Sequence, residues 1–240
     1  MKNICLFLSL LLVHSVFAQW PWEKIEGNGH IVKETRNLSG YTAVGSSGSW
    51  DVMIAYGQSN TIEVEGDENL LPYIETKVEN GKLMISNGKH SNLRSKNKIT
   101  IYITMTQLSG ISLSGSGDII GNGKFTNEGT TNFKLSGSGS IQLDFQKIRN
   151  ANLAISGSGK IRLTGAAESV ETHISGSGNI DCSQLISDRV AAYVSGSGNT
   201  RVNANASLEA HISGSGNIYY SGAAGSLQKH VSGSGRVIKS

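Results

Sequence analysis

The residues best suited to binding chemistry are three histidines and a tyrosine in the C-terminal third of the chain. His173, Tyr193, His211 and His230 each stand two residues before the tetrapeptide Ser-Gly-Ser-Gly. Imidazole nitrogens bind zinc, copper and nickel, so a column of these side chains could hold a metal ion or another ligand. The alternative is a stack of aromatic rings on the face of a sheet, where each cross-strand pair contributes roughly 0.2–1 kcal/mol.

We favour the aromatic stack over a metal site. No carboxylate or cysteine is expected to cluster with the histidines, and a flat column of rings gives poor tetrahedral geometry for zinc. We therefore expect no metal and no cofactor. The four residues are instead candidates for contact with a binding partner.

The acidic residues and the one cysteine of the repeats do not suggest a catalytic set. Asp144, Glu168, Glu171 and Asp181 fall at different positions of the repeat, whereas cleavage of a glycan needs an acid and a base that face one bond. Cys182 falls in line with inward apolar positions, where we expect a buried, unreactive thiol. We therefore predict no catalytic residues and no enzyme. The alternative is a polysaccharide-active enzyme, since β-helices host such enzymes.

The elements that must position these residues are set by the tetrapeptide. Apolar and polar residues alternate on both sides of each copy, with leucine, isoleucine or valine just before it and a β-branched residue two places after it. This alternation predicts a strand, a sharp corner, a second strand and a looser return in every repeat. The seven full copies, 18–22 residues apart, begin at Ser114, Ser136, Ser156, Ser175, Ser195, Ser213 and Ser232, and a degenerate copy begins at Ser47.

One repeat cannot fold alone. Burying about four side chains contributes roughly 1.5–3 kcal/mol each, whereas ordering about twenty residues costs on the order of 1–2 kcal/mol each. The repeats must stack, and their length leaves no room for helices. We therefore predict an all-β fold, a single-stranded parallel β-helix with turns about 4.8 Å apart. A right-handed coil is favoured by analogy with parallel crossovers, and the corner glycines should supply positive φ and close backbone approach.

The predicted organisation has three parts. Residues 1–18 are typical of a signal peptide, with Lys2, an apolar run and a Val16-Phe17-Ala18 cleavage site. An N-terminal segment covers 19–39, and the β-helix domain covers 40–240, irregular over 40–110 and regular over 111–240. In the irregular part, Asn80-Gly81 predicts a hairpin, and alternating apolar residues over 99–105 predict a strand. We expect this hairpin-containing section to cap the helix.

Charge and cysteine content narrow the function further. The chain carries 21 Lys and Arg against 18 Asp and Glu, which gives no reason to expect nucleic acid as a partner. One cysteine remains after the predicted cleavage, so no disulfide framework is expected. We predict export to the periplasm, the outer surface or the extracellular space, with no membrane span after cleavage. The partner, a protein or a glycan, and the oligomeric state stay open.

The tetrapeptide with its flanks resembles a known family. Ser-Gly-Ser-Gly followed by Asp or Asn and Ile, as at 114–119, 175–180 and 213–218, is similar to the head GIN domain family of auto-transporter adhesins. The leading segment Gly48-Ser49-Trp50-Asp51-Val52 strengthens the resemblance, which covers roughly 40–238. The family occurs largely in envelope proteins of Bacteroidetes-type bacteria. The resemblance implies an exported β-helical domain and an adhesive role along the helix face; a purely structural spacer is the other alternative.

Overall fold

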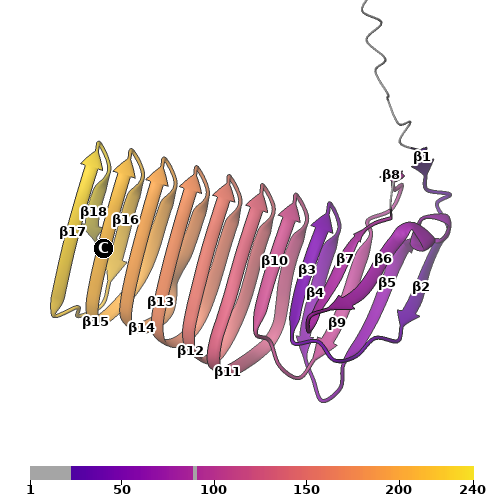
Figure 1. Ribbon diagram of the computed structural model, residues 1–240, viewed down its shortest axis with the longest axis horizontal. Coiled ribbons are helices and arrows are strands. Elements are labelled where there is room, and N and C mark those ends of the chain that lie inside the picture. Colours follow the sequence, from indigo (N-terminus) through magenta and orange to yellow (C-terminus); the bar gives the residue numbers. More distant parts are fainter. Residues whose placement is uncertain (1–22, 89–90) are drawn as a thin grey trace, which may run out of the picture.

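Long strands follow one another without helices between them from residue 110 to the C-terminus (Figure 1). The computed structural model describes residues 23–88 and 91–240. The predicted signal peptide (1–18) and the start of the predicted N-terminal segment therefore lie outside the described residues. The strands of the repeats are β10 (Gly110–Gly115), β11 (Asp118–Gly137), β12 (Ser140–Gly157), β13 (Lys160–Gly176), β14 (Asn179–Gly196), β15 (Asn199–Gly214), β16 (Asn217–Ser221), β17 (Ser226–Gly233) and β18 (Arg236–Lys239).

Each of these strands pairs in parallel with the corresponding strand of the next turn, which confirms the predicted β-helix. The tetrapeptides stack in register, since Ser136 pairs with both Ser114 and Ser156. The same register continues through β15 and β17 to the last copy. In Figure 1 the near strands rise toward the corners, and the chain returns on the far side as it advances toward the C-terminus, which makes the coil right-handed.

The first glycine of the tetrapeptide is required by the backbone of the corner. Gly196 has a φ of 119°, and the equivalent glycines of the other full copies have φ between 117° and 131°. A Cβ at Gly196 would lie 2.4 Å from the carbonyl oxygen of Gly176 one turn earlier. That oxygen accepts the N–H groups of Ser197 at 2.9 Å and Gly198 at 3.1 Å. Both predicted roles of the corner glycine, positive φ and close stacking, are confirmed.

The second glycine of the tetrapeptide makes room for the core. A Cβ at Gly198 would lie 2.7 Å from Cγ2 of Ile174, the aliphatic residue of the preceding turn. The first turn uses another solution, because Trp50 stands where later copies have this glycine. Ser46 replaces the aliphatic residue there, and the Trp50 Nε1–H donates to the Ser46 hydroxyl at 2.9 Å. Both residues are buried, so a small and a large side chain have exchanged places.

Inward side chains form continuous columns along the axis. The aliphatic residue before the tetrapeptide is at most 3% exposed in every turn from Leu113 to Ile212. Phe145 packs against both Phe125 and Phe133, with ring centroids 6.0 and 5.8 Å apart. Cys182 lies in this core beside Val202, and burial raises the pKa of its thiol to about 12. The predicted buried, unreactive cysteine agrees with this position.

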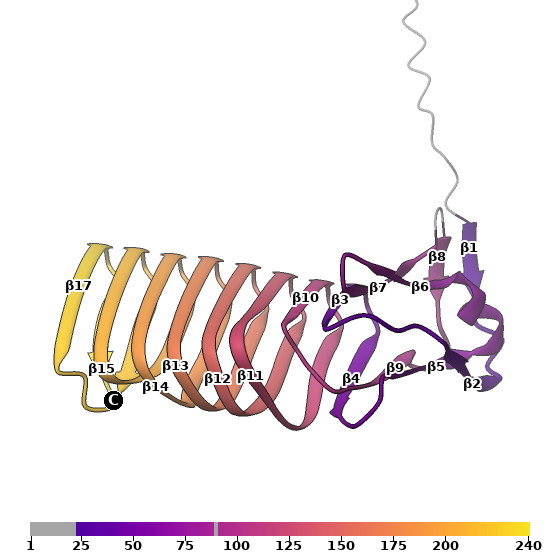
Figure 2. The ribbon, with the colours of Figure 1, turned by 60° about the horizontal axis from the view of Figure 1, so that its bottom comes forward.

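The irregular section extends the coil at its N-terminal end (Figure 2). The degenerate tetrapeptide joins β3 (Ala43–Gly48) to β4 (Asp51–Tyr56), which pair with β10 and β11 as the first turn. On one side follow β7 (Lys82–Asn87) and β6 (Ile74–Glu79), joined by the predicted hairpin, with φ of 50° at Asn80 and 72° at Gly81. On the other side follow the predicted strand β9 (Thr100–Met105), then β5 (Thr61–Asp67) and β2 (Ile31–Arg36). The short 3-10 helix η1 (Glu68–Tyr73) buries Leu70 and Leu71 at this end, and β1 (Glu23–Glu26) pairs in parallel with β8 (Ser91–Arg94).

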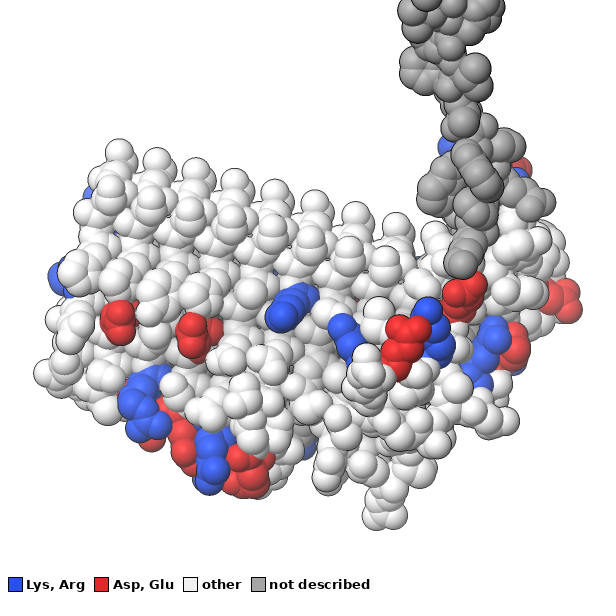
Figure 3. Space-filling model, in the orientation of Figure 1, with Lys and Arg blue, Asp and Glu red and all other residues white. Residues whose placement is uncertain are grey.

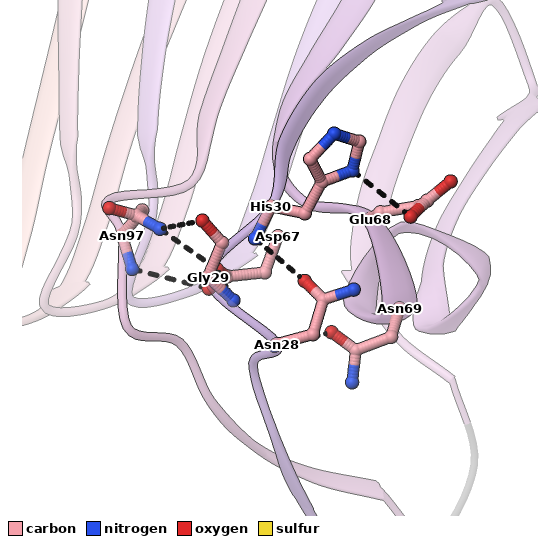
Figure 4. Close-up of polar contacts among 7 residues, drawn as sticks. All are labelled: Asn28, Gly29, His30, Asp67, Glu68, Asn69 and Asn97. Carbon is pink, nitrogen blue, oxygen red and sulfur yellow. Dashed lines mark hydrogen bonds and ion pairs between the residues drawn. The ribbon is translucent and has the colours of Figure 1, made fainter.

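A buried carboxylate holds this section together (Figure 4). The side chain of Asp67 accepts the backbone N–H groups of Gly29 at 2.9 Å, Lys96 at 2.8 Å and Asn97 at 3.2 Å, and the Asn97 amide at 2.9 Å. Asp67 is 0% exposed. Burial disfavours its charged form, but these four hydrogen bonds outweigh burial and lower the pKa of Asp67. The carboxylate therefore joins three segments that are distant in the sequence.

Candidate ligand-binding groove

A groove with a volume of about 1090 Å³ runs along the helix axis, over the strand ends that lead into the corners. Two columns of outward side chains form its walls, and the aliphatic residues between these columns also line it. One wall is the first serine of each tetrapeptide, namely Ser114, Ser136, Ser156, Ser175, Ser195, Ser213 and Ser232. The other wall is the position two residues earlier, namely Ser112, Lys134, Ala154, His173, Tyr193, His211 and His230.

The four predicted binding candidates lie together in the second wall as an aromatic stack. The ring centroids of His173 and Tyr193 are 4.6 Å apart, those of Tyr193 and His211 5.0 Å, and those of His211 and His230 4.8 Å. The interplanar angles are 5°, 16° and 18°. This arrangement confirms the predicted stack. Because each inner ring is covered on both faces by its neighbours, a ligand that lies along the groove meets ring edges.

Carboxylates accompany two of the histidines, and the expectation that none would do so was wrong. Glu171 contacts Nε2 of His173 at 2.6 Å, and Glu209 contacts Nε2 of His211 at 2.7 Å. The Tyr193 hydroxyl donates to Glu209 at 3.4 Å, and burial, followed by the charge of Glu209, raises the pKa of Tyr193. The signal was present in the sequence, since residues i and i+2 of a strand share a face.

These pairs orient the imidazoles. Within residues 23–88 and 91–240, no group of three or more His, Cys, Asp or Glu side chains could hold a metal ion.

The other carboxylates considered as acid or base groups have separate local partners. Asp144 accepts a hydrogen bond from Thr164. Glu168 lies 3.4 Å from the Lys147 ammonium, and Asp181 accepts the Ser183 hydroxyl at 2.7 Å. The structure gives each of them a different neighbour.

The N-terminal end of the groove is basic, which sequence reasoning missed. Lys82 reaches across Gly45, where a Cβ would lie 2.6 Å from Lys82 Cε, and donates to the Ser112 hydroxyl. Ser112 pairs in register with Lys134 of the next turn. Burial, and then the charge of Lys134, lowers the pKa of Lys82. Lys82 belongs to the hairpin β6–β7, so the repeat pattern could not place it beside the groove.

Few other charges lie near the corners on this face. In Figure 3 charged side chains gather toward the lower edge of the repeats and over the N-terminal section, while the rows along the corners carry none.

Comparison with known families decides where this fold belongs. A family model described as "putative auto-transporter adhesin, head GIN domain" matches residues 40–224. The chain belongs to the head GIN domain family. The resemblance seen in the sequence is therefore confirmed. A search of curated proteins found no match.

Solved structures share the head GIN fold over most of this chain. A "putative adhesin" from Bacteroides fragilis has a TM-score of 0.86 at 23% identity, covering 90% of this chain and 100% of its own. A "putative adhesin" from Parabacteroides merdae has a TM-score of 0.73 at 24% identity, with coverage of 90% and 99%. A "putative lipid binding protein" from Parabacteroides distasonis has a TM-score of 0.71 at 26% identity, with coverage of 91% and 100%. In the described part of this chain, no helix is long and apolar enough to cross a membrane.

Proposed function

We propose that this head GIN domain protein is an exported, non-catalytic binding protein that holds a partner along its groove. The observation that carries the proposal is the groove itself, which runs along the repeats between two side-chain columns. Membership of a family named for adhesins supports the same role. The signal-peptide pattern in residues 1–18 supports a location in the periplasm, on the outer surface or outside the cell.

The rigidity of the groove favours binding along its length. Strands β10 to β15 are paired with a neighbouring turn on both edges, so the walls are held at a fixed spacing without a partner. A preformed surface loses little conformational entropy when a ligand binds. The partner must be recognised by side chains, because the backbone groups of these strands are used between turns.

Two alternatives compete with this function. A polysaccharide-active enzyme would need a general acid and a general base that face the same glycosidic bond. The carboxylates of the repeats instead contact separate neighbours. Release of unsaturated product from polygalacturonate would favour the enzyme. A structural spacer needs no groove. A protein that binds no ligand would favour the spacer.

Filling the groove is expected to abolish binding. Ser175 and Ser213 are exposed and line one wall, so tyrosine at both positions would obstruct the groove without entering the core. A panel of neutral glycans, acidic glycans and extracellular-matrix proteins is probed with wild type and with the Ser175→Tyr, Ser213→Tyr variant. We expect at least one ligand whose apparent affinity falls tenfold or more in the variant.

The matched control places the same side chains outside the groove. Gln142 and Gln146 are exposed residues of β12, and Gln142→Tyr, Gln146→Tyr should bind like wild type. Equal binding by the groove variant would mean that the ligand lies elsewhere. Binding of no ligand by wild type would contradict the proposed function.

A further inference from the structure

We propose that Lys82 and Lys134, together with Ser112, form an anion-binding site at the N-terminal end of the groove, and that the partner is an acidic polysaccharide. This inference rests on the proposed function and names the chemical class of its ligand. Its evidence lies in three features: two ammonium groups without carboxylate partners, a glycine that gives one of them access, and a wall of hydroxyl groups.

Among the described lysines, Lys82 alone is partly buried, and its ammonium has no carboxylate partner. Lys33, Lys98 and Lys147 each lie within 3.5 Å of a carboxylate oxygen. Among the described residues, no carboxylate lies within 4.0 Å of the Lys82 or Lys134 ammonium, and the hydroxyl of Ser112 is the polar side chain that Lys82 contacts. Partly buried charges are normally compensated. A ligand anion between the two ammonium groups would supply the missing charge.

Gly45 gives Lys82 its access to the groove. Gly45 stands in the same column as Ser112 and Lys134, and a side chain there would occupy the space now filled by the end of Lys82. The lowered pKa of Lys82, caused by burial and then by the charge of Lys134, agrees with a second cation nearby.

The serine wall of the groove favours a polysaccharide over other elongated anions. The serine wall offers hydroxyl groups about 4.8 Å apart, at the spacing of the turns, and these can hydrogen-bond to a ligand rich in hydroxyls. An acyl chain would remove the same hydroxyls from water without replacing their hydrogen bonds, which is costly. A peptide could not add as a strand, because β10 to β15 have no free edge over the groove.

The test compares two variants that remove the same charge. Polygalacturonate, neutral dextran and palmitate are titrated separately into wild type, into Lys82→Met, Lys134→Met, and into Lys124→Met, Lys160→Met. Lys124 and Lys160 are exposed and lie outside the groove lining. We expect polygalacturonate binding to fall more than tenfold in the first variant and less than threefold in the control. Added salt should weaken binding to wild type, because exposed charges are screened.

A third variant keeps the net charge. Gly45→Ala would displace the end of Lys82 from Ser112, so its polygalacturonate affinity should fall between those of wild type and the double methionine variant. Circular dichroism of all variants establishes that each is folded.

Each contrary outcome has a distinct meaning. Equal losses in both double variants would overturn the anion site and indicate attraction by net charge. Binding of dextran but not polygalacturonate, blocked by tyrosines in the groove, would overturn the inference and leave the proposed function intact. Palmitate binding that depends on the two lysines would overturn it in favour of a lipid. Failure of the whole ligand panel would contradict the proposed function as well.

Discussion

Replacing Gly196 by alanine is expected to destabilise the β-helix by about 3 kcal/mol or more. The backbone at this corner has a φ of 119°, a conformation that costs an L-residue on the order of 1–3 kcal/mol. The new Cβ would also lie 2.4 Å from the Gly176 carbonyl oxygen. That oxygen cannot retreat easily, because it accepts two N–H groups of the next corner. The loss would be a large share of a typical stability of about 5–15 kcal/mol.

Urea unfolding followed by circular dichroism measures this effect, and Gly129→Ala is the matched control. A Cβ at Gly129 would find its nearest atom, the Asn127 side-chain oxygen, at an ordinary 3.4 Å, and Gly129 has no positive φ. We expect the control to change stability by less than about 1 kcal/mol. Equal unfolding midpoints for the two variants would refute the account of the corner.

Replacing Asp67 is expected to disrupt the N-terminal section. Asp67→Ala leaves the N–H groups of Gly29, Lys96 and Asn97 without their acceptor, and hydrogen bonds to a charged group are worth about 1.5–3 kcal/mol each. We expect a loss on the order of 3–5 kcal/mol. Asp67→Asn should also destabilise, because the new amide would turn N–H groups toward backbone donors.

The pH dependence follows from the lowered pKa of Asp67. A carboxyl whose pKa is lower in the folded state contributes stability above its unfolded pKa, about 3.9 for aspartate, and loses that stability as pH falls through the folded pKa. Wild type should therefore lose stability in acid over this pH range, and Asp67→Asn should lack this pH-dependent loss.

The fluorescence of buried Trp50 is a suitable signal for unfolding. Asp188→Asn, at an exposed position, is the control and should show the same dependence of stability on pH as wild type. Identical acid unfolding profiles for Asp188→Asn and Asp67→Asn would contradict the role of Asp67.

The repeating part of the fold was predictable because its determinants are local. The alternation around Ser114 and the glycine beside it specify one corner, and stacking copies that corner along the axis. The hairpin at Asn80-Gly81 was equally readable, because that pair prefers positive φ at both residues.

The rest depends on contacts between distant segments. Nothing near Asp67 in the sequence indicates that Gly29 and Asn97 will donate to it. The contact of Lys82 with the groove residue Ser112 was also not predictable, because the position of Lys82 depends on how β7 pairs with β3. The Glu171–His173 pair was predictable, because the two residues are two apart on one strand and therefore share a face.

A ligand bound in the groove would lie against the histidine side chains, so their signals report where it binds. His173, His211 and His230 line the groove, whereas His30 lies in the N-terminal section beside Glu68, at 3.1 Å. Imidazole resonances are recorded by NMR while polygalacturonate is added to the protein. We expect the signals of the three groove histidines to shift and saturate together, while that of His30 stays in place. Saturable binding that leaves the signals of the groove histidines unchanged, or that shifts the His30 signal equally, would rule out binding in the groove.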